Sequence, residues 1–417
     1  MNKRKFSFFL LVGLGLVQCT GPTGSDEPDY GVLPRALTAQ EIELAASSDR
    51  FGLKLFREMV RQQPDSNIFI SPLSVSMALG MTANGADSTT LDSMRATLEL
   101  NDLTEEESNQ AYRSLIDLLT KADPKVRFDI ANSIWCQQGW TFKNDFYQRC
   151  QDYFNAVVQG LDFSDPAAAD VINAWVREQT QDKIQDIVDK PLDPMIIMYL
   201  INALYFKGTW TYEFDPEDTE DDVFTLPDGS SVPCRMMALE TDLHYMATEQ
   251  FQAVDLPYGD GLFSMTVLLP RAGVHVDSVI GLMTPENWPG WIGALDAAPV
   301  LLQMPRFRLE YARQLNKVLS TLGMRIAFGI GPVDFSRMCE PPGLIWIDKV
   351  KHKTFVQVDE EGTEAAAVTS VEMTYESAGP SSIPFRVDRP FVFVIRERTS
   401  GALLFMGKIV EPVWEEG

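Results

Sequence analysis

The 417-residue sequence is poor in histidine, cysteine and positive charge, with three His, five Cys and 35 basic against 59 acidic residues. The formal net charge of −24 argues against nucleic acid as a partner, because phosphate binding needs clustered lysine and arginine. His244, His275 and His352 are far apart, which disfavours a histidine-rich metal site. We therefore expect no metal and no cofactor.

The motifs of common enzyme classes are also missing. The chain contains no G-x-S-x-G, no S-x-x-K, no H-E-x-x-H, no G-x-x-x-x-G-K-[ST] and no G-x-G-x-x-G. We predict that the protein is not an enzyme. The alternative is a catalytic group assembled from residues dispersed along the chain.

Cysteine usage does not suggest a disulfide-stabilised fold. The four cysteines beyond the N-terminal segment are widely separated and lack C-x-x-C spacing. They are Cys136, Cys150, Cys234 and Cys339. Buried free thiols are the favoured interpretation, and a single bridge stays open as the alternative.

The N-terminus has the pattern of an export signal. Lys3, Arg4 and Lys5 precede an apolar run over 6–17, which is typical of a secretory signal peptide. The residues Leu-Val-Gln-Cys at 16–19 resemble a bacterial lipoprotein cleavage box, in which Cys19 would be lipidated. We predict a signal peptide over 1–18, a flexible spacer over 19–36 and one large domain over 37–417. The product would be an outer-membrane or cell-surface lipoprotein, or a secreted protein in which Cys19 only belongs to the signal.

The rest of the chain mixes helical and strand patterns. Hydrophobic content of 45% is ample for a core. Helical periodicity predicts helices beginning at the capping box Thr38–Glu41 and over 71–85, 115–119, 170–188 and 312–322. Strand patterns occur at 127–136, 198–205, 265–269, 300–304, 355–358 and 391–395. This mixture predicts an α+β fold with mostly antiparallel sheets.

One run, 360–376, alternates like a strand but stands where a loop is expected. Every second residue from Thr363 to Tyr375 is uncharged, and the carboxylates of Glu364, Glu372 and Glu376 occupy the other register. The run is long for a strand and continues into 377–384, which is rich in Ser, Gly and Pro. The pattern is therefore typical of a strand with one buried face, but the run is followed by a loop-like sequence and not by a hairpin turn.

This run and several further motifs resemble those of serpins. The motifs follow the family's order from about 37 to 412: N-I-F-I-S-P-L-S at 67–74, I-A-N-S-I-W at 130–135, I-N-A-W-V at 172–176, L-I-N-A-L-Y-F-K-G-T-W at 200–210, D-L-P-Y at 255–258, the run at 360–376, R-P-F-V-F-V-I-R at 389–396 and L-F-M-G-K-I-V-E-P at 404–412. The resemblance implies three mainly antiparallel β-sheets, eight to nine helices and an exposed reactive-centre loop at about 361–388.

The resemblance also implies a function and site residues. A serpin traps a serine protease as a covalent acyl complex when its cleaved loop inserts into the main sheet; cysteine proteases are a further possible target class. The hinge would be Glu361, Gly362, Thr363, Glu364, Ala365, Ala366 and Ala367. The shutter would be Ser71, Ser74, Asn202 and His352, and the breach tryptophan would be Trp210. A small, uncharged Thr363 and the absence of proline from the run suit insertion.

The reactive bond is less well determined than the hinge. Counting from the hinge places it between Glu376 and Ser377, whereas counting back from Pro390 places it about three residues later, near Gly379. Tyr375, Met373 and Thr374 are alternative sites. We expect a monomer whose partners are target proteases and whose only membrane contact would be a lipid on Cys19. The alternative function is a non-inhibitory serpin that acts as a binding protein.

Overall fold

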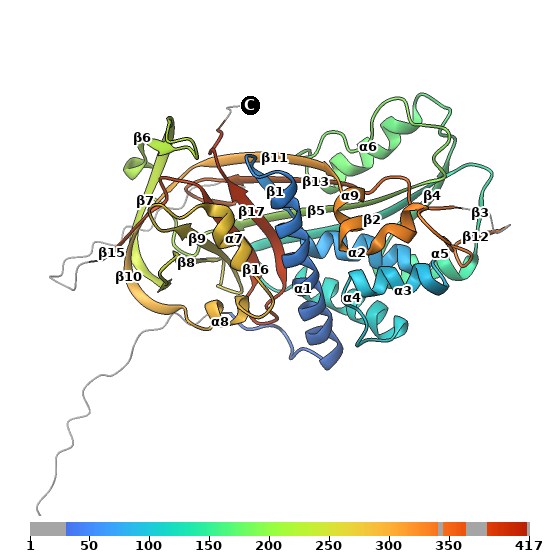
Figure 1. Cartoon of the computed structure of the whole chain (residues 1–417), viewed down its shortest axis with the longest axis horizontal. Coiled ribbons are helices and arrows are strands. Elements are labelled where there is room, and N and C mark those ends of the chain that lie inside the picture. Colours follow the sequence, from blue (N-terminus) through green and yellow to red (C-terminus); the bar gives the residue numbers. More distant parts are fainter. Residues whose placement is uncertain (1–30, 341–344, 364–381, 415–417) are drawn as a thin grey trace, which may run out of the picture.

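The computed structural model describes residues 31–340, 345–363 and 382–414 (Figure 1). The predicted signal peptide and several predicted site residues lie outside these ranges. These residues are Cys19, Glu364, Ala365, Ala366, Ala367, Met373, Thr374, Tyr375, Glu376, Ser377 and Gly379. The last part of the predicted spacer contacts the domain, since Gly31 donates its backbone N–H to the Asp260 carbonyl over 2.6 Å.

Nine α-helices lie within the described residues, as the resemblance implies. Their bounds are α1 Ala39–Gln62, α2 Pro72–Ala83, α3 Ser88–Thr97, α4 Glu105–Leu119, α5 Asn144–Phe154, α6 Ala168–Gln179, α7 Val276–Leu282, α8 Trp288–Ile292 and α9 Asn316–Leu322. Short 3₁₀ turns occupy Pro216–Asp218 and Met324–Phe328. The predicted capping box opens α1: Glu41 N–H donates to Thr38 Oγ1 (3.2 Å) and Thr38 N–H donates to Glu41 Oε2 (2.7 Å).

Two predicted helices are too long. The helix predicted over 170–188 ends at Gln179, because Gln181 and Asp182 adopt positive φ angles of 51° and 60° that an α-helix cannot contain. The following chain folds back along α6, where the buried Asn173 amide bonds the backbone of Val188. The helix predicted over 312–322 starts only at Asn316, since the preceding residues pair with a neighbouring strand.

The larger sheet has nine strands in the order β1-β17-β16-β9-β8-β7-β10-β15, with β6 paired to β7. The bounds are β1 Ile68–Ile70, β6 Glu220–Thr225, β7 Ser231–Ala247, β8 Phe251–Tyr258, β9 Phe263–Pro270, β10 Asp296–Pro305, β15 Ile383–Arg386, β16 Phe391–Glu397 and β17 Leu403–Ile409. Its central strands are buried on both faces, which explains their continuous apolar runs.

A six-stranded sheet has the order β11-β13-β14-β5-β2-β4. The bounds are β11 Phe307–Gln314, β13 Lys351–Val358, β14 Gly362–Thr363, β5 Met198–Thr209, β2 Val126–Gln137 and β4 Val157–Leu161. A third sheet pairs β3 (Thr141–Phe142) with β12 (Cys339–Glu340). Pairing is antiparallel except between β2 and β4 and between β10 and β15. The predicted α+β class with three mainly antiparallel sheets is confirmed.

The two faces of the six-stranded sheet are covered differently (Figure 1). Helix α2 packs on the inner face at β5 and lies in the main core. Helix α6 covers part of the outer face, where its apolar residues pack with Trp135, Ile201 and Phe355 in a separate cluster. Even-numbered residues of β5 such as Leu204 and Phe206 therefore face the core, whereas Tyr199 and Ile201 lie on the outer face with α6.

In the described part of the chain, no helix is both long and apolar enough to cross a membrane. The same residues contain no group of three His, Cys, Asp or Glu side chains that could hold a metal ion.

Candidate functional site: the hinge, breach and shutter of the six-stranded sheet

The predicted hinge begins as a strand inside the six-stranded sheet. Gly362 and Thr363 form β14, in which Thr363 pairs with Val358 of β13 on one side and with Gly208 of β5 on the other. In the described residues, β13 and β5 are joined in the sheet only through β14. Thr363, the last described residue before position 382, therefore lies between these two strands.

Gly362 is required by a close backbone approach. A Cβ atom at this position would lie 2.1 Å from the Gly208 carbonyl oxygen, far inside van der Waals contact. Gly208 is constrained in the same way, because its own Cβ would lie 2.9 Å from the Tyr258 ring. The two glycines allow β14 to enter between β5 and β13.

The predicted breach tryptophan, Trp210, belongs to a stack of aromatic rings beside β14. Trp210 follows β5 directly, and its ring stacks on Tyr258 with centroids 4.4 Å apart and planes 14° apart. Trp210 Nε1–H donates to the Asp359 carbonyl (3.0 Å). The Tyr258 hydroxyl lies 2.6 Å from Thr363 Oγ1, and both residues are buried. Burial raises the pKa of Tyr258 well above its usual value, so the phenol stays neutral beside the hinge.

An ion pair secures the turn between β13 and β14. Glu360, only 6% exposed in its side chain, accepts hydrogen bonds from Arg306 Nε and Thr219 Oγ1, both at 2.6 Å. Trp210 N–H and Phe214 N–H donate to the carbonyls of Glu361 and Glu360 at 2.9 and 3.0 Å. The hinge turn is thus tied to three different elements of the body.

The four predicted shutter residues lie together beneath the middle of the sheet. Ser71 N–H donates to His352 Nε2 (3.1 Å), and Ser71 Oγ, the N-cap of α2, accepts from Ser74 N–H (3.3 Å). Ser74 Oγ–H donates to Asn202 Oδ1. Asn202 Nδ2 in turn donates to Asn132 Oδ1 over 2.6 Å. This network joins α2 to β13, β5 and β2.

His352, the predicted shutter histidine, is neutral at physiological pH. His352 is 6% exposed, and burial lowers its pKa from 6.5 to about 4. A neutral ring is needed here because Nε2 accepts the Ser71 N–H, which a protonated imidazole could not do. Protonation would therefore break the link between β13 and α2.

Comparison with known proteins matches this geometry to one family. The family model described as "Serpin (serine protease inhibitor)" matches residues 46–412. The chain belongs to the serpin family. Most serpins inhibit serine proteases, some do not, and none acts as an enzyme, which agrees with the missing catalytic motifs.

Similar serpins are known from distant organisms. Iripin-2 of Ixodes ricinus is 33% identical over 376 residues, which cover 89% of this chain and 94% of the relative. Human antithrombin-III is 29% identical and covers 93% of this chain and 86% of the relative. The native structure of tengpin, a thermophilic serpin, has a TM-score of 0.82 at 31% identity and covers 91% of this chain and 96% of that one. Human thyroxine-binding globulin with its ligand has a TM-score of 0.83 at 28% identity, covering 90% and 100%.

Several residues of the serpin hinge region were not singled out from the sequence. The pair Arg306–Glu360 was missed because its members are separated by 54 residues and meet only through the pairing of β11 with β13. Tyr258 entered the sequence analysis only as the last residue of the D-L-P-Y motif, without a predicted role at the hinge. The sequence did offer one signal for the Arg306–Glu360 pair. Glu360 directly precedes the predicted hinge, so a partner for its carboxylate would fix the position of the hinge.

The four thiols support the interpretation drawn from the sequence. Cys136, Cys150 and Cys339 are buried, Cys234 is half-buried, and none of the four forms a disulfide. Burial raises the pKa of Cys136 to about 12 and that of Cys234 to about 11. These thiols are poor nucleophiles near neutral pH.

Proposed function

We propose that this serpin is a suicide-substrate inhibitor of serine proteases, and of cysteine proteases with a compatible specificity. The observation that carries the proposal is the pairing of Thr363 with both β13 and β5. Because Thr363 already lies between these two strands in the intact protein, loop insertion would extend an existing strand and would not have to start a new one. A family model of serine protease inhibitors adds independent support.

The protease would treat the loop as a substrate. Its serine or cysteine nucleophile attacks the carbonyl of the residue before the scissile bond, the new amine leaves, and an ester or thioester holds the inhibitor's upstream segment. If the loop then inserts behind Thr363, about 14 residues at about 3.3 Å each carry the protease on the order of 45 Å. Insertion before deacylation distorts the protease and prevents release.

The energy for this movement comes from strand pairing and burial. New backbone hydrogen bonds form on both sides of the inserted strand, and its apolar register leaves water. The native state would therefore be metastable and held by a kinetic barrier, to which the breach and shutter contribute. The reactive bond that we favour is Glu376–Ser377, with Tyr375, Met373, Thr374 and Gly379 as alternative cleavage positions.

The test is a panel of proteases that cleave after Glu, after Tyr or Met, and after small residues. The proposal predicts an SDS-resistant complex of higher mass with at least one of them, and mass spectrometry of the released peptide identifies the bond. Complete cleavage by every protease without a trapped complex would contradict inhibition and would favour the binding-protein alternative.

We also propose export, with Cys19 as a lipidated N-terminus. The support is the basic and apolar order of residues 3–17 followed by the cleavage-box pattern at 16–19. Metabolic labelling with palmitate in a bacterial host should mark the full chain and not the Cys19→Ala variant. Labelling of neither protein, with the product in the medium, would favour the secreted form.

A further inference from the structure

The C-terminal segment, residues 410–414, leaves the larger sheet in a direction that side chains fix. Asn67 Oδ1 accepts the backbone N–H groups of Val410 and Glu411 at 2.7 and 3.1 Å. Asn67 Nδ2 donates back to the Glu411 carbonyl over 2.7 Å. Pro412, the next residue, is buried. The segment is therefore held in place directly after β17 ends.

A second anchor brings the C-terminal segment to the six-stranded sheet. Strand β11 is the edge of that sheet, so one side of its backbone lacks a strand partner among the described residues. Arg308 N–H on β11 donates to the Val413 carbonyl over 2.7 Å, which satisfies a donor of this edge. Trp414 follows at once and is half-buried beside the start of β11.

The ring of Trp414 covers the guanidinium of Arg306. The Arg306 Cζ atom lies 5.5 Å from the ring centroid, within the range of a cation–π contact. Arg306 stands between β10 and β11, where the chain passes from the larger sheet to the six-stranded one. Its backbone N–H donates to the Arg235 carbonyl over 2.9 Å, so the main chain fixes where the side chain begins.

The same guanidinium holds the hinge turn. Arg306 Nε donates to Glu360 Oε1 over 2.6 Å, and Arg306 Nη2 pairs with the same oxygen. Glu360 lies two residues before β14, the strand of Gly362 and Thr363. Arg306 therefore contacts both the C-terminal segment and the hinge turn. The family model ends at residue 412, so it assigns no role to Trp414.

An aromatic ring in this position strengthens the ion pair. Arginine loses rotamer freedom when it binds a carboxylate, and a ring that already confines the planar guanidinium reduces that loss. The ring also displaces water from Arg306, whose side chain is 25% exposed, and Coulomb attraction grows as the surroundings become less polar. An aliphatic side chain would cover the site without the negative π face that attracts a cation.

We propose that Trp414 is a positioning residue for the hinge, which acts through Arg306 on Glu360. The C-terminal segment would then contribute to the barrier that keeps the hinge turn in its native place. This inference rests on the proposed function only in giving the hinge a role in inhibition. The contact itself belongs to the intact protein, so its test needs no protease.

The first test is a double-mutant cycle, measured by thermal unfolding of the intact protein. Trp414→Leu should lower the thermal midpoint of wild type and should have a clearly smaller effect in the Arg306→Ala background. Trp414→Tyr keeps an aromatic face and should recover a large part of the loss. Equal effects of Trp414→Leu in the two backgrounds, or equal midpoints of Trp414→Leu and Trp414→Tyr, would overturn the inference.

Hydrogen exchange tests whether the effect reaches the hinge. A peptide that covers 357–363 should exchange about threefold to tenfold faster in Trp414→Leu, as expected when a cation–π contact no longer opposes local opening. A peptide from α4 should be unchanged. Faster exchange of 410–414 without a change at 357–363 would mean that Trp414 secures only its own segment, and would overturn the inference.

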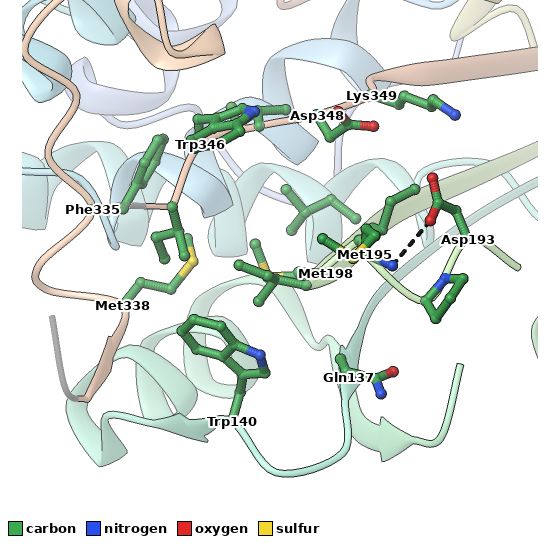
Figure 2. A pocket seen from close by; sticks show the side chains of 16 residues that line it. Gln137, Trp140, Asp193, Met195, Met198, Phe335, Met338, Trp346, Asp348 and Lys349 are labelled. Carbon is green, nitrogen blue, oxygen red and sulfur yellow. Dashed lines mark hydrogen bonds between the residues drawn. The ribbon is translucent and has the colours of Figure 1, made fainter. Parts of the chain in front are cut away.

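Trp346 provides the matched tryptophan control. It is 52% exposed at the rim of a cavity of about 490 Å³ (Figure 2). Met198 and Leu200, at the start of β5, line this cavity, whereas β14 pairs with the end of that strand. Trp346→Leu therefore removes the same ring far from the hinge and should leave exchange at 357–363 unchanged. An increase there equal to that of Trp414→Leu would show general loosening and contradict a specific contact.

The two proposals can fail separately. If wild type traps no protease, the proposed function fails, while coupling between Trp414 and Arg306 would still support the contact with the hinge. If wild type traps a protease and the cycle shows no coupling, inhibition stands and the role of Trp414 is rejected.

Discussion

Thr363 Oγ1 lies 2.6 Å from the hydroxyl of Tyr258, which is stacked on Trp210. This contact holds the Thr363 side chain in the core, where the residue is only 2% exposed. Insertion would continue from this residue along the sheet, so the size and charge of the side chain at 363 should control the rate at which the loop inserts.

Thr363→Arg should convert the inhibitor into a substrate. A guanidinium at this position would have to be buried against Tyr258 without a carboxylate partner, at a cost of several kcal/mol. Since 1.4 kcal/mol in a barrier changes a rate about tenfold, the stoichiometry of inhibition should rise by about tenfold or more. This stoichiometry is measured by titrating a fixed amount of an inhibited protease with each variant and recording the residual protease activity. Thr363→Ser, which keeps the hydroxyl, should behave like wild type, and an unchanged stoichiometry in the arginine variant would contradict the role of the hinge.

Breaking the Arg306–Glu360 pair should destabilise the native state. Arg306→Ala leaves the Glu360 carboxylate largely buried without its cation, which should cost about 2 kcal/mol, between the values for exposed and buried pairs. The double variant with Glu360→Ala should recover part of this loss in thermal unfolding. The exposed pair Lys121–Asp117 is the control, since Lys121→Ala should change stability by less than about 0.5 kcal/mol. Equal effects of Arg306→Ala and Lys121→Ala would argue against a special role for the hinge pair.

Stability should fall in mild acid because of His352. Its pKa is about 4 in the folded protein against a usual value of 6.5, so between these values the unfolded chain binds a proton that the native state does not. The contribution of neutral His352 is complete above about pH 6.5 and is lost as the pH falls toward 4, by at most about 3 kcal/mol.

Urea midpoints measured from pH 7.5 to 4.5 check this expectation. The difference between wild type and His352→Gln should narrow as the pH falls, because the variant lacks the titrating ring. A constant difference between wild type and His352→Gln would contradict the assignment.

The cysteines should behave as free, shielded thiols. In the Cys19→Ala variant, a thiol reagent should react in the native state with Cys234 at most, because the other three are buried. All four should react after denaturation without a reductant. A loss of two thiols in the denatured titration would reveal a disulfide and contradict the structure.

The sequence predicted the strands of this protein better than its helix ends. Alternating or continuous apolar runs placed β2, β5 and β16 within a few residues, because these strands are buried on one or both faces. The end of α6 could not be predicted, since it depends on the positive φ of Gln181 and Asp182 and on Asn173 holding the returning chain. Those interactions are tertiary and have no periodic signal.

The candidate site was predictable only through the family resemblance. Spacing alone does not indicate that Ser71 and His352, 281 residues apart, would share a hydrogen bond. The resemblance named the four shutter residues, and the structure brings them together in one network. It did not name Arg306, because the contact of this residue with Glu360 depends on how β11 and β13 pair.

The most direct test of the account is the thermal midpoint of the protein before and after a single cut in the reactive-centre loop. If the loop inserts between β5 and β13, the cleaved protein should unfold at a much higher temperature than the intact one, and Thr363→Arg should show a clearly smaller increase. An unchanged midpoint after complete cleavage of wild type would contradict insertion, and with it the proposed mechanism of inhibition.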